Sequence, residues 1–136
     1  MSAMEQFASA QAARLLGKLA IQVRHAAKHS NEEAIHDLRV SIRRFSQCLR
    51  EFRQFFPRRH AHKILKKVEQ VMDLAAEMRN RDIAIKLIGG NGSSAESVLV
   101  TGLSEEREQA KQKLTKALAN WRRRDFSRKW RPWLDI

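Results

Sequence analysis

The chain has 136 residues, of which 43% are hydrophobic, so it can bury one core of modest size in a single domain. Lysine and arginine number 27 against 15 aspartate and glutamate, a net charge of +12 that predicts a polyanionic partner or an anionic surface. A single cysteine, no basic apolar leader and no apolar run of membrane length predict a cytoplasmic protein without an internal disulfide, signal peptide or membrane segment.

Helical periodicity runs through most of the chain with few breaks. Residues 3–28 are rich in Ala, Leu and Gln and are expected to form the first helix. A capping box in Ser30–Glu33 opens the second helix, which we expect to end near Phe56 because Pro57 disfavours a helical residue before it. Apolar residues of this second helix step by three and four positions, as in the seam of a helical bundle. These seam residues are Ile35, Leu38, Ile42, Phe45, Leu49, Phe52 and Phe56.

The rest of the chain continues the helical pattern. A third helix is expected from Arg58, and it either continues through Asn80 or bends there. The Gly- and Ser-rich residues 89–94 predict a flexible loop before the last long helix. No alternating β pattern of useful length exists, so we expect an all-α fold, an antiparallel four-helix bundle over residues 1–121. Residues 122–136 are expected to form a basic, tryptophan-containing tail.

The strongest concentration of positive charge lies on the second helix. With about 100° between successive residues, His36, Arg39, Arg43 and Arg50 fall within a sector roughly 60° wide. They extend over about 21 Å, and the apolar seam lies roughly 120° away, so the stripe borders a groove between helices. Arginine forks bind phosphate oxygens through two hydrogen bonds. The stripe therefore favours an extended, phosphate-rich ligand over a single small anion.

Neighbouring helices add further cations to this picture. Between His36 and Lys67 the sequence has ten Lys or Arg and only two acidic residues, Asp37 and Glu51. The imbalance disfavours the alternative, a set of ordinary solvated helix faces. Helical spacing on the first and third helices gives the additional candidates Arg14, Lys18, His25, Lys63 and Lys67.

Two segments carry a resemblance to a known family. The segment HDLRVSIRR (His36–Arg44) resembles the signature of CHAD domains, the conserved histidine α-helical domain family, and MRNRDIAI (Met78–Ile85) resembles the family's later Arg-Asp segment. Order and spacing agree over about residues 10–120. The resemblance implies a basic helical module that binds inorganic polyphosphate along a positively charged groove. It places on that surface His36, Arg39, Arg43, Arg44 and, more weakly, Arg81.

The chain departs from the family in having one copy of its motif. A full CHAD domain contains two pseudo-repeated helical bundles, whereas this chain has no second His-x-x-Arg-Val segment. It resembles one half of the domain, and a homodimer would rebuild the two-bundle groove. We expect a binding module rather than an enzyme, with no cofactor, and the resemblance also suggests association with polyphosphate granules.

Several residues support competing interpretations. His36 fits a phosphate ligand, a structural residue or the phosphoacceptor of a phosphotransfer bundle, and the adjacent arginines favour the first. His60 and His62 stand two residues apart and cannot share a helix face, so surface positions are favoured over a metal site. Trp130 and Trp133 are left open between packing and stacking on bases.

Two other function classes compete with polyphosphate binding. A nucleic-acid backbone is also a linear phosphate polymer, and binding to either would weaken steeply with salt. The basic stripe has no aromatic platform or reading helix for bases, which disfavours nucleic acid as the partner. A structural adaptor for an enzyme of phosphate metabolism is the third interpretation.

Overall fold

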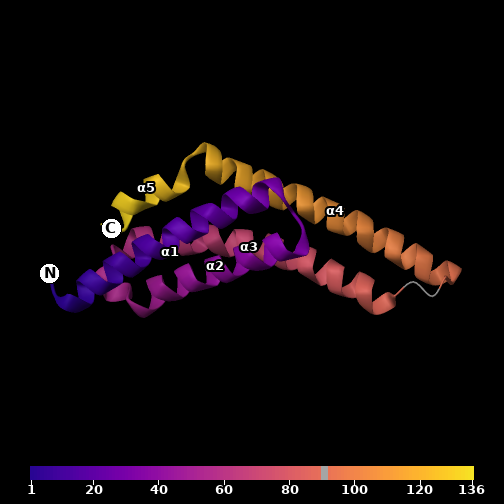
Figure 1. Cartoon of the computed structure of the whole chain (residues 1–136), viewed down its shortest axis with the longest axis horizontal. Coiled ribbons are helices and arrows are strands. Elements are labelled where there is room, and N and C mark those ends of the chain that lie inside the picture. Colours follow the sequence, from indigo (N-terminus) through magenta and orange to yellow (C-terminus); the bar gives the residue numbers. More distant parts are fainter. Residues whose placement is uncertain (90–91) are drawn as a thin grey trace.

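The structure is a computed structural model that describes residues 1–89 and 92–136. These residues form α1 (Ala3–Lys28), α2 (Glu32–Glu51), the short 3₁₀ helix η1 (Arg53–Phe55), α3 (Arg58–Ile88), α4 (Ser94–Arg123) and α5 (Phe126–Trp133). Figure 1 shows α1 to α4 running antiparallel to their chain neighbours. The described residues contain no strand, so the predicted all-α class is confirmed. The centre of the expected loop at 89–94 lies outside the described residues.

Polar caps and one tight turn set the helix ends. The hydroxyl of Ser2 accepts a hydrogen bond from the Glu5 amide at 3.1 Å, and the side chain of Asn31 accepts one from the Ala34 amide at 2.8 Å. The predicted end of the second helix at Phe56 is wrong, because the helix stops at Glu51 and the chain tightens into η1. This turn returns the Phe56 ring to the core. α3 continues through Asn80 without a break.

The core forms around the apolar seam of α2, which packs against both α1 and α3. Leu38, Phe45 and Leu49 have no exposed surface. Burying a side chain of this size stabilises a fold by about 1.5–3 kcal/mol. The basic residues that flank the seam are therefore held at the edges of the α2 interfaces.

The C-terminal residues are part of this core. Asp125, in the left-handed region at φ 50°, turns the chain from α4 into α5. Trp130 of α5 is only 2% exposed and stacks on Phe45, with ring centroids 6.3 Å apart. Trp121 and Phe126 surround it at centroid distances of 5.2 and 5.0 Å. The residues expected to form a tail thus supply an aromatic cluster that closes one end of the bundle. Of the two interpretations of Trp130, packing and stacking on bases, the structure supports packing.

The far end of the α3–α4 hairpin differs from the rest of the molecule. Figure 1 shows it extending beyond the connection between α1 and α2. Within 79–109, none of the described residues is buried. Ile83, Leu87, Val98 and Leu99 are exposed there. Among the described helices, none has the length and apolar character needed to cross a membrane.

Replacing Trp130 with alanine tests whether α5 belongs to the core. We expect Trp130→Ala to lower the free energy of unfolding by about 3–5 kcal/mol, because it empties a site enclosed by three aromatic rings. Chemical denaturation followed by circular dichroism measures the change. Ile21→Ala, on the exposed side of α1, serves as the control and should cost less than about 1 kcal/mol. Equal effects of the two substitutions would contradict this packing.

Candidate functional site: a basic groove between α2 and α3

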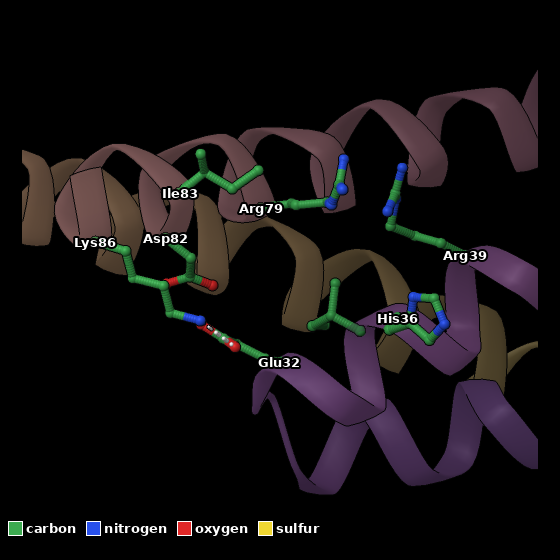
Figure 2. Close-up of a pocket in the computed structure, with 8 residues that line it drawn as sticks. Glu32, His36, Arg39, Arg79, Asp82, Ile83 and Lys86 are labelled. Atoms are coloured by element: carbon green, nitrogen blue, oxygen red, sulfur yellow. Dashed lines mark hydrogen bonds and ion pairs between the residues drawn. The ribbon is translucent and has the colours of Figure 1, made fainter.

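A pocket of about 250 Å³ lies between the N-terminal part of α2 and the C-terminal half of α3. Its polar lining comes from Glu32, His36 and Arg39 of α2 and from Arg79, Asp82 and Lys86 of α3. Figure 2 shows the side chains of Arg39 and Arg79 extending toward each other across it. The positions 79, 82, 83 and 86 share one face of α3, which is why one helix supplies so many of these groups.

Arg39 is the least exposed cation of the pocket. Its Nε is buried and has no hydrogen-bond partner among the described residues. Burial lowers the pKa of Arg39 below the usual value for arginine, and the charges of Arg79 and Arg43 lower it further. A buried donor without a partner and two nearby like charges all destabilise the free protein. An anion in the pocket would relieve each of these costs.

The two carboxylates at the pocket are already paired with cations. Glu32 accepts a hydrogen bond from Lys86 at 2.8 Å, and Asp82 is paired with Arg107 of α4. The Glu32–Lys86 pair is exposed, so it contributes about 0–1 kcal/mol and exchanges easily for another partner. The net field at the centre of the pocket is therefore set by Arg39 and Arg79.

The groove continues along α2 with a different charge balance. A second pocket of about 170 Å³ lies against Arg43 and Arg50, where α3 contributes Glu69 and Asp73. Two acidic residues thus oppose two arginines at this end, whereas the His36 end holds an excess of cations. The predicted stripe does border a groove, but its positive charge is concentrated near Arg39.

The structure divides the other predicted site residues among separate surfaces. Arg14 and Arg44 line a pocket between α1 and α2, away from the α2–α3 groove. Arg81 is paired with Glu106 of α4 at 3.2 Å. Lys18 and His25 are exposed on α1.

Lys63 and Lys67 lie on the side of α3 that faces α5. Lys67 lines a pocket there, and the Nζ of Lys63 lies 4.7 Å from the centroid of the Trp133 ring. His60 also packs on Trp133, with ring centroids 5.5 Å apart. Neither lysine lines the two α2–α3 pockets.

Arg79 and Lys86 are the groove cations that the sequence reasoning missed. Arg79 stands inside the segment Met78–Ile85, where only Arg81 was singled out. The spacing of seven residues between Arg79 and Lys86 puts them on one helix face, which is the signal that could have found them. Which face of α3 meets α2 is decided by packing.

Comparison with known proteins gives one kind of match. The family model described as CHAD domain matches residues 10–135, so it includes the basic segments of α2 and α3 and the whole of α5. The resemblance inferred from His36–Arg44 is confirmed by this match. No curated protein and no solved structure matches the chain.

Replacing Arg39 with a neutral side chain of similar length tests the electrostatic cost of the site. We expect Arg39→Met to raise the free energy of unfolding by about 1 kcal/mol in dilute, phosphate-free buffer, because it removes the unpaired buried donor. Urea denaturation measures the change, and added salt should reduce the part that comes from charge repulsion. Arg44→Met, at an exposed position of the other groove, is the control and should have a smaller effect. A loss of stability in Arg39→Met would contradict the assignment.

Proposed function

Because the chain belongs to the CHAD domain family, we propose that its α2–α3 groove binds inorganic polyphosphate without catalysing a reaction. CHAD domains are associated in general with polyphosphate binding, and they are generally binding modules rather than enzymes. The observation that carries the proposal for this chain is the pocket at Arg39, where an unpaired guanidinium nitrogen is buried beside a second arginine.

The chemistry of the pocket suits a chain of phosphates. A phosphate oxygen can accept the hydrogen bond that Arg39 Nε does not make within the protein, and Arg79 offers a second fork from the opposite helix. His36 borders the same pocket. Lys86 joins them when a phosphate replaces the exposed Glu32 carboxylate as its partner. The groove then leads the ligand toward Arg43 and Arg50.

Because the charge along the groove is uneven, we expect phosphates to bind more tightly at one end of it. Glu69 and Asp73 reduce the positive field around Arg43 and Arg50, so fewer phosphates are held firmly there. The segment at Arg39 provides most of the affinity, and the rest of the groove guides the chain. Short polyphosphates that fill only the Arg39 end retain most of the affinity of longer ones.

A nucleic-acid backbone is the competing partner. The lining of the two α2–α3 pockets contains no Phe, Tyr or Trp side chain and a single imidazole, that of His36, so these pockets offer little surface on which bases could stack. Excess polyphosphate should displace labelled single-stranded DNA, whereas DNA should displace polyphosphate poorly. The opposite order would favour nucleic acid as the partner.

Titration with polyphosphate at about 50 and 200 mM salt tests the groove directly. We expect Arg39→Gln/Arg43→Gln to weaken binding by about tenfold or more and to make its salt dependence shallower, because fewer phosphates are neutralised. The matched control is Lys116→Gln/Arg128→Gln, which removes the same charge from exposed positions outside the groove. Equal polyphosphate affinities of the groove variant and the wild-type protein would refute the site. That result would favour the interpretation of the chain as a structural adaptor.

We also propose that two copies of the chain associate through the ends of their α3–α4 hairpins. The hairpin end exposes Ile83, Leu87, Val98 and Leu99, and Ile83 also lines the Arg39 pocket. Residues 79–109 carry four basic and five acidic side chains, a net charge of −1, while the rest of the chain carries +13. Two copies can therefore meet at this end without the repulsion that their basic bodies would cause. The groove pocket then lies beside the joint.

Light scattering over a range of protein concentrations tests the homodimer. We expect twice the monomer mass for the wild-type chain, and Val98→Glu/Leu99→Glu should give the monomer because it places charges in the apolar contact. Ser104→Glu/Gln109→Glu adds the same charge at exposed positions of the same helix and should leave the mass unchanged. A strictly monomeric wild-type protein that still binds long polyphosphate tightly would refute the dimer without affecting the groove.

A further inference from the structure

A separate pocket of about 210 Å³ lies between α3, α4 and α5. The residues of α3 that line it face roughly 120° away from those that line the Arg39 pocket. A ligand here would not touch the α2–α3 groove. The pocket therefore needs an explanation of its own.

One part of this pocket is a cluster of cations from α3, from α5 and from the residue that follows α4. Lys67 of α3, Arg124 after α4 and Lys129 of α5 line it, and no carboxylate does so among the described lining residues. Burial lowers the pKa of Lys67, and the charges of Lys63, Lys129 and Arg124 lower it further. These positive charges repel one another in the free protein, so a bound anion would stabilise their arrangement.

Aromatic packing positions one member of this cluster, Lys129, and the neighbouring Lys63. The Nζ atoms of Lys63 and Lys129 lie 4.7 and 5.2 Å from the centroid of the Trp133 ring, within the range of cation–π attraction. The Trp133 carbonyl oxygen lies 3.1 Å from the Nδ1 of His60, which ties the end of α5 to α3. Lys129 and the end of α5 are thus positioned before any ligand binds.

The other part of the pocket is apolar. Val71 and Leu74 of α3, together with Trp121 of α4, form a wall next to the cations. The side-chain amides of Gln70 and Asn120 add polar groups at the edge of this wall. A concave site that combines converging cations and amides with an apolar wall suits a ligand that has both a charged group and an apolar body. An inorganic phosphate chain would gain nothing from the apolar wall.

We propose that this pocket binds a small phosphate ester, a phosphate group joined to an apolar or aromatic body. The phosphate lies against Lys67, Arg124 and Lys129, and the body lies against Leu74 and Trp121. The site rests on residues that the polyphosphate proposal does not need, so either proposal can fail while the other holds.

The distribution of tryptophan provides a direct measurement. All three tryptophans of the chain, Trp121, Trp130 and Trp133, line this pocket, and none lines the α2–α3 pockets. Tryptophan fluorescence excited at long wavelength therefore reports directly on this site, whereas a ligand in the α2–α3 pockets lies against no tryptophan. We expect phenyl phosphate, as the probe, to quench or shift the emission in a saturable way.

The probe is compared with its two halves, phenol and orthophosphate. We expect phenyl phosphate to bind at least about ten times more tightly than either half, because it uses the cations and the apolar wall together. Lys67→Gln/Arg124→Gln should reduce its affinity by about tenfold or more, whereas Arg39→Gln/Arg43→Gln should leave it unchanged. Circular dichroism and a denaturation curve verify that each variant is folded.

Three results would overturn the proposal. Equal affinities for orthophosphate and phenyl phosphate would mean that the apolar wall has no role. Unchanged binding in a folded Lys67→Gln/Arg124→Gln variant would mean that the cations have none. A fluorescence change caused by polyphosphate at lower concentration than by phenyl phosphate, and lost in the same variant, would assign the pocket to the polyphosphate surface.

Discussion

Burial of the apolar seam of α2 is the constraint on which the rest of the molecule depends. Leu38, Phe45 and Leu49 are fully enclosed because α1 and α3 pack on the same helix and α5 closes its end through Trp130. A helix fixed in this way cannot rotate, so the stripe that begins at His36 must stay at the border of α3. The hydrophobic core thereby determines where the charge is displayed.

Placing like charges close together destabilises the free protein, and the fold does so at two places. At Arg39, burial and the approach of Arg79 act against the charged side chain, and at Lys67 burial and three further cations do the same. Both places are pockets, and in both the unfavourable interactions would be relieved by an anion. The two pockets differ in their walls, because only the one near α5 is lined by tryptophan and phenylalanine. This difference is the basis for assigning them different ligands.

Charge also distinguishes the ends of the molecule. The excess of basic residues belongs to the body, whereas the projecting end of the α3–α4 hairpin is nearly neutral and exposes large apolar side chains such as Leu87 and Val98. This end of the hairpin has no buried residue among its described positions, so it gains little stability from its own packing. Its contribution to the fold comes from its base, where Met78 and Ala110 join the core.

The sequence by itself determined the helical class, the seam of α2 and the basic stripe that flanks it, because these depend on spacing within one helix. It also supplied the resemblance of His36–Arg44 that the family match confirms. Only the tertiary structure decided which basic residues of different helices lie together. Packing turned Arg79 toward Arg39, turned Lys63 and Lys67 toward α5, and placed Arg44 in the groove with Arg14. Periodicity fixes the angle between residues of one helix, but the orientation of one helix against another depends on contacts between distant parts of the chain.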